Sequence, residues 1–190
     1  LNDEVAAAWS RILAALPGSV LRLKAHGLDD PRTRAWVSER RFAPHGIGPE
    51  RLEFAGHGSH AEAMAAWNAI DLALDPFPFS GCATTCDALW MGVPVVTLEG
   101  HAHVARGGVS LLSRRGLTEW IAHSAPEYVE IAARRAARHE TAREQEERER
   151  DPGLPAPRVQ ICRRRGDGHR RRFRDGRLLD GEAGGLRRVT

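Results

Sequence analysis

Cysteine and long apolar runs are both scarce in this chain of 190 residues. Its three cysteines, Cys82, Cys86 and Cys162, are too few for the disulfide framework that stabilises small secreted domains. We therefore expect reduced thiols and a cytoplasmic protein. No apolar run approaches the ~20 residues that a helix needs to cross a bilayer, so no membrane-spanning segment is expected. Residues 1–4 show neither an initiator methionine nor a signal-peptide pattern, and we interpret the chain as part of a longer protein.

Recognised metal-binding signatures are also missing. The sequence contains no HExxH and no pair of CxxC motifs, so we expect no metal. Cys82 and Cys86 are four residues apart, but Cys82 precedes the predicted helix that contains Cys86, which we predict to be a small buried hydrophobic residue. One alternative stays open, a zinc site drawn from these cysteines and from His57, His60, His101 and His103.

Positive charge is concentrated near the C-terminus. The net charge is only +3, yet residues 163–165 and 170–172 are all arginine. We predict a folded domain over residues 1–138, followed over 139–190 by a charged helix and a disordered Arg/Gly-rich tail. The arginines allow a second class of function, a module that binds nucleic acid or an acidic protein. Because Phe173 is the only aromatic residue among them, we do not expect nucleic acid to be the partner.

Apolar periodicity predicts alternating strands and helices along the first 138 residues. Such alternation is typical of βαβ units and predicts an α/β fold, a Rossmann-like parallel sheet flanked by helices. The predicted strands are residues 20–23, 52–55, 70–74 and 95–98. The predicted helices are residues 3–16, 30–42, 61–68, 84–91, 104–115 and a last one from 126. In such folds the loops that follow the strands share one edge, where ligands bind.

One stretch, residues 70–98, combines a strand, a turn of small residues and the start of a helix. The turn contains Gly81 and Ala83, and Thr84 and Thr85 open the helix. The first amides of a helix have no internal acceptor, and the helix dipole adds partial positive charge there. Small residues let an anion approach, and threonine hydroxyls add donors. The sequence therefore indicates a phosphate or diphosphate site; the alternative is that Thr84 only caps the helix.

The same stretch resembles the nucleotide-sugar site of the O-linked N-acetylglucosaminyltransferase and SPINDLY family. Members carry a segment close to LDPFPYNGGTTTCDALWMGVPVVTL, and this chain reads LDPFPFSGCATTCDALWMGVPVVTL. The similarity extends from the first residue to about Ala137. The resemblance implies the C-terminal half of a two-domain, GT-B type glycosyltransferase, with the reaction in the cleft between two Rossmann-like halves.

The resemblance also implies binding roles for individual residues, while the catalytic residues stay unknown. The turn and helix start would bind the diphosphate of a UDP-sugar, and Asp87 would accept hydrogen bonds from the ribose diol. Gly58 and His60 align with the segment that touches uracil and ribose, and Arg106 matches a family arginine near the same edge. The implied donor-binding set is Gly58, His60, Gly81, Cys82, Ala83, Thr84, Thr85, Asp87 and Arg106.

Several positions depart from the family pattern. Related animal enzymes have lysine at the position of His60, and the family has a histidine where this chain has Ala63. Cys82 and Ala83 replace the usual His and Thr, or Gly and Thr. Losing one charge-assisted hydrogen bond costs roughly 1.5–3 kcal/mol, so these changes predict weakened donor binding.

The resemblance implies transfer of N-acetylglucosamine from UDP-GlcNAc to Ser or Thr hydroxyls of proteins, without a metal or other cofactor. Its implied partners are the UDP-sugar, acceptor proteins, a missing N-terminal catalytic half and tetratricopeptide repeats. The chain alone is expected to be inactive. The donor sugar stays open, because plant relatives transfer fucose from GDP with a similar domain. The alternative function is a catalytically dead Rossmann-like remnant that binds a partner.

Overall fold

The computed structural model describes residues 1–56 and 58–150, with side chains up to residue 138. Its α-helices are α1 Asp3–Ala15, α2 Pro31–Val37, α3 His60–Ala66, α4 Ala83–Trp90, α5 Gly107–Arg114 and α6 Ala125–Arg150. Its strands are β1 Leu21–Lys24, β2 Leu52–Ala55, β3 Ala73–Leu74, β4 Val95–Leu98 and β5 Ile121–Ala122. Short π- and 3-10-helical turns are η1 Ser38–Phe42, η2 Ala43–His45, η3 Pro49–Arg51, η4 Trp67–Ala69, η5 His103–Ala105 and η6 Thr118–Trp120.

Local sequence explains where several helices begin and end. The Asn2 side chain accepts a hydrogen bond from the Val5 amide and starts α1. Asp30 starts α2 in the same way, accepting from two amides of the first turn. Gly116, with a φ of +69°, follows the end of α5, where a left-handed residue stops the helix.

All strand pairs are parallel, as predicted, but hydrogen bonding divides them into two sheets. β1 pairs with β2, with Leu21 opposite Leu52, and the second sheet has the order β3-β4-β5. The strand predicted over residues 70–74 is shorter than expected, because Ile70 still donates to Trp67 at the end of η4. The ladder to β4 therefore begins only at Ala73.

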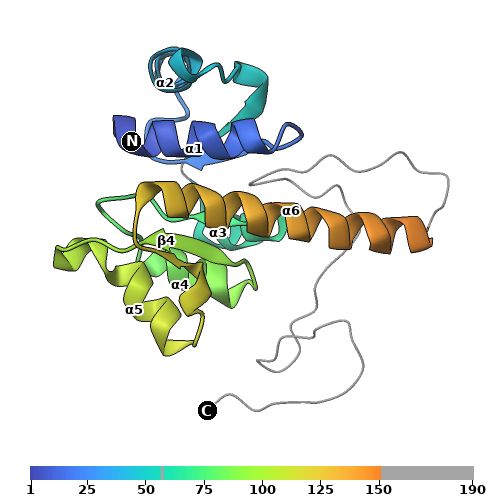
Figure 1. Cartoon of the computed structure of the whole chain (residues 1–190). Helices are drawn as coiled ribbons and strands as arrows, with labels where there is room; N and C mark the ends of the chain where they lie inside the picture. The colour runs from blue at the N-terminus through green and yellow to red at the C-terminus, as the bar shows by residue number, and fades with distance from the viewer. Residues whose placement is uncertain (57, 151–190) are drawn as a thin grey trace.

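Helices cover both faces of the second sheet. In Figure 1 the long α6 crosses the middle of the molecule, with β4 on one side of it and α1 on the other. α4 and α5 lie beyond β4, away from α6. Tyr128 of α6 is fully buried between these layers: it accepts from Trp9 Nε1 at 3.1 Å and donates to the Asp75 carbonyl at 3.0 Å. One apolar core, which includes Leu21, Leu52 and Val96, spans both sheets.

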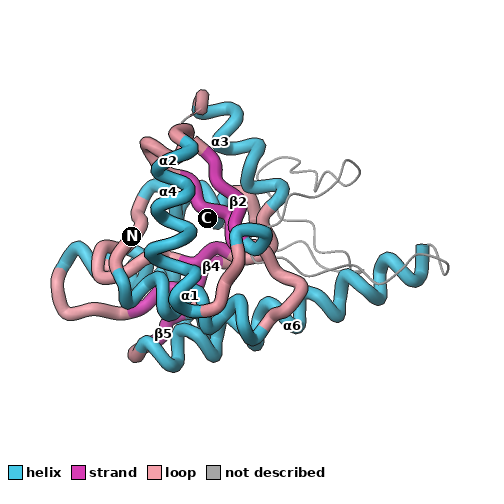
Figure 2. Tube along the Cα trace, turned by 90° about the horizontal axis from the view of Figure 1, so that it is seen from above, coloured by secondary structure: helices cyan, strands magenta, loops and turns pink. Residues whose placement is uncertain are grey.

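α6 joins two segments that the sequence suggested separately. The helix predicted from residue 126 and the charged helix predicted beyond 139 form one element, and its C-terminal end extends past the other elements (Figure 2). No glycine or proline occurs between residues 127 and 150, and alanine and arginine are strong helix formers. The division predicted at residue 138 thus falls inside a helix. The Arg/Gly-rich tail predicted beyond it lies outside the described residues, apart from the helical part up to 150.

No described helix combines the length and apolar character required to cross a membrane.

Candidate functional site

The loops that follow β3 and β4 are joined at one edge of the sheet. The Ser80 amide and hydroxyl both donate to the Val104 carbonyl, at 3.0 and 2.9 Å. The Gly107 amide, at the start of α5, donates to the Ser80 hydroxyl at 3.0 Å. Because β3 and β4 are parallel neighbours, the starts of α4 and α5 meet at their carboxyl ends, where ligands bind in such folds.

Asp75 supports this turn from inside the protein. The residue is 3% exposed. Its Oδ1 accepts from the Gly81 amide at 2.6 Å and its Oδ2 from the Thr97 hydroxyl at 2.7 Å. Burial raises the pKa of the Asp75 carboxyl, while the two hydrogen bonds act in the opposite direction. From sequence alone, Asp75 is predicted only to end a strand. A carboxylate directly after a buried strand was the signal that could have identified it.

Two glycines make this arrangement sterically possible. A Cβ on Gly81 would lie 2.6 Å from Thr84 Oγ1, so the threonine hydroxyl folds back over the turn. A Cβ on Gly108 would lie 2.4 Å from Asp75 Oδ2 and 2.5 Å from Thr97 Oγ1. The Gly81 amide already donates to Asp75, so the contribution of Gly81 to a ligand site is close approach of the backbone.

α4 begins at Ala83, with Cys82 as its N-cap, and Cys82 makes no side-chain cap. The alternative in which Thr84 caps the helix is therefore wrong. The first intrahelical bond runs from the Cys86 amide to the Cys82 carbonyl, so the helix offers no acceptor to the amides of residues 83–85. Cys82, Ala83 and Thr84 are exposed, whereas Thr85 is buried.

Asp87 lies one turn into α4 and is half-buried. Cys86, predicted to be buried, is exposed instead. The reason is helical geometry, because the buried residues Thr85 and Ala88 turn their face of α4 toward the sheet and leave position 86 outside.

Gly58 and His60 lie in a different setting, after β2 and at the start of α3. Both are exposed, and Ser59 forms a capping box with Glu62: each side chain bonds to the backbone of the other's residue. These bonds to Ser59 lower the pKa of the Glu62 carboxyl. Among the described residues, no hydrogen bond joins this loop to the loops that follow β3 and β4.

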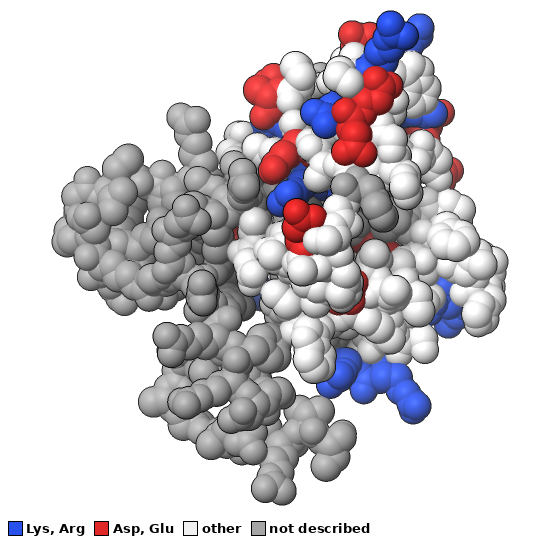
Figure 3. Space-filling view, turned by 180° about the vertical axis from the view of Figure 1, so that it is seen from behind, with Lys and Arg blue, Asp and Glu red and all other residues white. Residues whose placement is uncertain are grey.

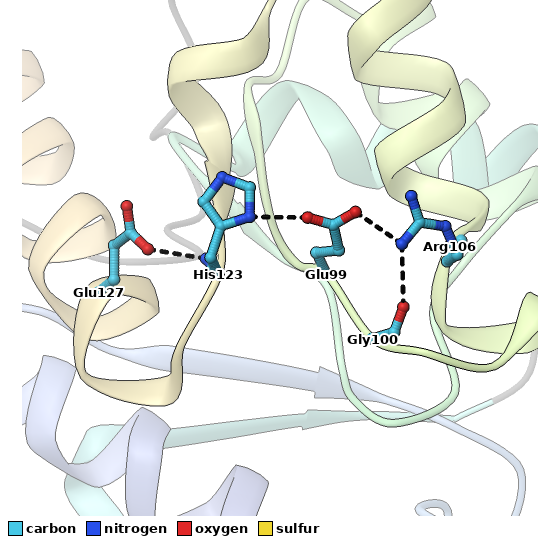
Figure 4. A network of polar contacts seen from close by, with 5 residues as sticks. All are labelled: Glu99, Gly100, Arg106, His123 and Glu127. Atoms are coloured by element: carbon cyan, nitrogen blue, oxygen red, sulfur yellow. Dashed lines mark hydrogen bonds and ion pairs between the residues drawn. The ribbon is translucent and has the colours of Figure 1, made fainter.

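Arg106 is the N-cap of α5 and takes part in a polar network (Figure 4). Its Nη1 lies 2.6 Å from Glu99 Oε1 and 3.2 Å from the Gly100 carbonyl. The other Glu99 oxygen, Oε2, lies 2.7 Å from His123 Nδ1, and the His123 amide donates to Glu127 at 2.7 Å. His123 and then Arg106 lower the pKa of Glu99.

Glu99 and His123 are not among the site residues predicted from the sequence. Each follows a strand, β4 and β5, so their place at the same sheet edge was the available signal.

No group of three or more metal-ligating side chains gathers among residues 1–56 and 58–138. Of the residues named for the alternative zinc site, His57 lies outside the described residues, so its place relative to the others is not described. For the nucleic-acid alternative, the arginine runs at 163–172 also lie outside them. On the face shown in Figure 3, acidic and basic side chains of the described part intermingle near one end and form no broad patch of one sign.

Comparison with known proteins gives one consistent family. A sequence model of glycosyl transferase family 41 matches residues 1–150. The chain is 35% identical over 144 residues to a Petunia hybrida protein named "Probable UDP-N-acetylglucosamine--peptide N-acetylglucosaminyltransferase SPINDLY". It is 43% identical over 142 residues to a protein of the same name from Eustoma exaltatum subsp. russellianum. In both cases the match covers 72% of this chain but only 15% of the relative.

A solved structure is also similar. The Thermobaculum terrenum O-GlcNAc transferase mutant K341M superposes with a TM-score of 0.70 at 41% identity, covering 78% of this chain and 29% of that one. The predicted α/β fold of GT-B type and the predicted family resemblance are thereby confirmed. The chain spans only a small part of each of these relatives.

Proposed function

Because the chain belongs to glycosyl transferase family 41, we propose that it is the donor-binding part of a protein O-GlcNAc transferase. Such an enzyme moves N-acetylglucosamine from UDP-GlcNAc to Ser or Thr hydroxyls of proteins. One observation carries the proposal: the uncapped first turn of α4, held at the carboxyl edge of β3 and β4 by Asp75 and Ser80. Backbone donors fixed at that edge suit a diphosphate.

The proposed reaction is direct displacement at the anomeric carbon. The acceptor hydroxyl oxygen bonds to that carbon, its proton passes to a base, and the bond to the diphosphate breaks with its electron pair leaving on UDP. The amides of residues 83–85 and the Thr84 hydroxyl stabilise the charge that develops on the leaving group. Asp87 accepts hydrogen bonds from the ribose diol. These protein donors take the place of a metal, and the base belongs to the other half of the enzyme.

The wider setting follows from the same assignment. We propose that the chain works with a second Rossmann-like half and with tetratricopeptide repeats of a longer cytoplasmic protein, and that it needs no cofactor. Gly58 and His60 form the nucleoside side of the site, and Arg106 lies at its rim, where Glu99 competes with an incoming phosphate for the guanidinium.

A second candidate is a remnant that no longer binds UDP. Cys82 and Ala83 are exposed at the helix start, yet neither side chain supplies the donors found in relatives. Each missing charge-assisted bond costs roughly 1.5–3 kcal/mol, so two losses would abolish useful affinity.

Isothermal titration calorimetry of the 190-residue chain with UDP separates the two candidates. We expect micromolar binding in the wild type, and Thr84→Ala and Asp87→Ala to weaken it by about 10- to 150-fold each, the range expected for one hydrogen bond to a charged group. Thr118→Ala is the matched control, because an exposed threonine before β5 lies at the opposite edge of a parallel sheet. No heat at millimolar UDP would support the remnant.

A further inference from the structure

Asp75 contacts none of the reacting groups in the reaction described above, yet it is the only carboxylate among the buried polar side chains of the described residues. Both of its carboxylate oxygens are bonded, at 2.6 and 2.7 Å, to donors from two different segments. We propose that Asp75 is the positioning residue of the donor site: held by Thr97 in β4, it orients the Gly81 amide and thereby the first turn of α4. This inference rests on the proposed function, because the α4 turn is the diphosphate site.

The backbone of Asp75 is as well fixed as its side chain. Its amide donates to the Val96 carbonyl at 2.9 Å, and its carbonyl accepts from the buried Tyr128 hydroxyl at 3.0 Å. A Cβ on Gly108 would lie 2.4 Å from Oδ2, so the space beside the carboxylate admits no side chain at position 108. Both oxygens of the carboxylate and the backbone of Asp75 are therefore held by hydrogen bonds.

The residue that Asp75 holds lies close in sequence to the start of α4. Gly81, bonded to Asp75, is separated from the first residue of α4 by Cys82 alone. Ser80 is bonded independently to the loop after β4 and to α5. Two adjacent residues are thus anchored to different elements, and α4 cannot shift along the sheet edge without breaking both anchors. Fixed donors cost less reorganisation when an anion binds.

The protonation behaviour of Asp75 fits a role in positioning better than a role in stability. Burial raises its pKa, so the ionised form is the one that folding disfavours. An ionised carboxylate is nevertheless a stronger acceptor for two hydrogen bonds than a neutral side chain.

The first test measures UDP affinity and the melting temperature together. We expect Asp75→Ala and Thr97→Val to weaken UDP binding by about tenfold, as misplacement of donors should. Ser19→Ala is the control: it removes a buried hydrogen bond to the Leu16 carbonyl in the segment before β1, outside the donor site, so the melting temperature should fall while UDP affinity stays unchanged. Wild-type affinity in Asp75→Ala and Thr97→Val, with Thr84→Ala still impaired, would overturn the inference and leave the proposed function standing.

The second test needs no ligand. The NMR shift of the Gly81 amide proton should follow the titration of Asp75 in the full chain, and Thr97→Val should move the midpoint to higher pH, because the Thr97 hydrogen bond lowers the pKa of Asp75. If the chemical shift of the Gly81 amide proton changes neither with pH nor in Thr97→Val, Asp75 does not hold the turn. If the wild type fails to bind UDP, the proposed function fails, and this measurement still decides whether Asp75 positions the helix start.

Discussion

Two loops of this molecule follow a parallel strand and lead into a helix, yet they are held in different ways. The turn between β3 and α4 is anchored from inside by Asp75 and Ser80, which are both buried. The loop between β2 and α3 ends in a surface capping box of Ser59 and Glu62. Water can replace the partners of exposed groups but not those of buried ones. A turn that must present donors in a fixed direction therefore needs support from inside the protein. Among the described residues, which exclude position 57 of the second loop, only the first loop has such support.

Gly108→Ala should break the anchored turn most severely. Its Cβ would lie 2.4 Å from Asp75 Oδ2, so either the carboxylate or α5 must move. We expect a loss of about 3 kcal/mol in the free energy of unfolding, at the upper end for overpacking, measured by urea denaturation. The control in the other loop is Gly58→Ala, whose Cβ would meet only the end of the Glu62 side chain, and it should cost no more than about 0.5 kcal/mol. Equal losses would contradict the comparison.

Removing one serine from each loop compares their anchors directly. Ser80→Ala leaves the Gly107 amide without its acceptor and should cost about 1–3 kcal/mol, the penalty for an unsatisfied buried donor. Ser59→Ala removes an exposed cap and should cost about 1 kcal/mol or less. Thermal unfolding measures both losses, and the larger loss is expected in Ser80→Ala. A greater loss in Ser59→Ala would show that the surface cap is the stronger anchor.

Adding a hydroxyl at each helix start should sharpen the contrast in ligand binding. Ala83→Thr restores a donor at the first residue of α4, where the side chain is exposed, and should tighten UDP binding about tenfold by calorimetry. Ala61→Thr places the same group in the first turn of α3, and we expect a change of about twofold or less. If UDP binds more tightly only to Ala61→Thr, the diphosphate site lies at the start of α3 and not at the start of α4.

The smallest expected effect is a pH dependence of opposite sign in the two loops. Asp75 has a raised pKa, so its contribution to stability is present below its unfolded value of 3.8 and is lost as pH rises through the folded value. Glu62 has a lowered pKa, so its contribution is present above 4.5 and is lost as pH falls through the folded value. We therefore expect the free energy of unfolding of Asp75→Asn, relative to the wild type, to increase as pH rises across the acidic range. That of Glu62→Gln, relative to the wild type, should decrease over the same range, and urea denaturation at several pH values measures both. The same trend in both variants would contradict the assignments.

Local chemistry made much of the fold predictable. Asn2, Asp30 and Gly116 mark helix ends because their caps depend on neighbouring residues only. The extent of the last helix past residue 138 and the exposure of Cys86 were harder to infer, because the first depends on how far a helix continues and the second on which face of α4 meets the sheet. Among the predicted site residues, those of the α4 turn lie together, while Gly58 and His60 lie in the other loop.

The amino-acid sequence by itself determined the alternation of strands and helices, the small-residue turn before α4 and the family, since each depends on residue types at short spacing. Only the tertiary structure decided which groups hold the turn before α4 in place through hydrogen bonds. Asp75 meets Thr97 across 22 residues, and Ser80 meets Gly107 across 27, because parallel neighbours bring the ends of successive strands together. Contacts of that range depend on strand order and register, which residue spacing along the chain does not reveal.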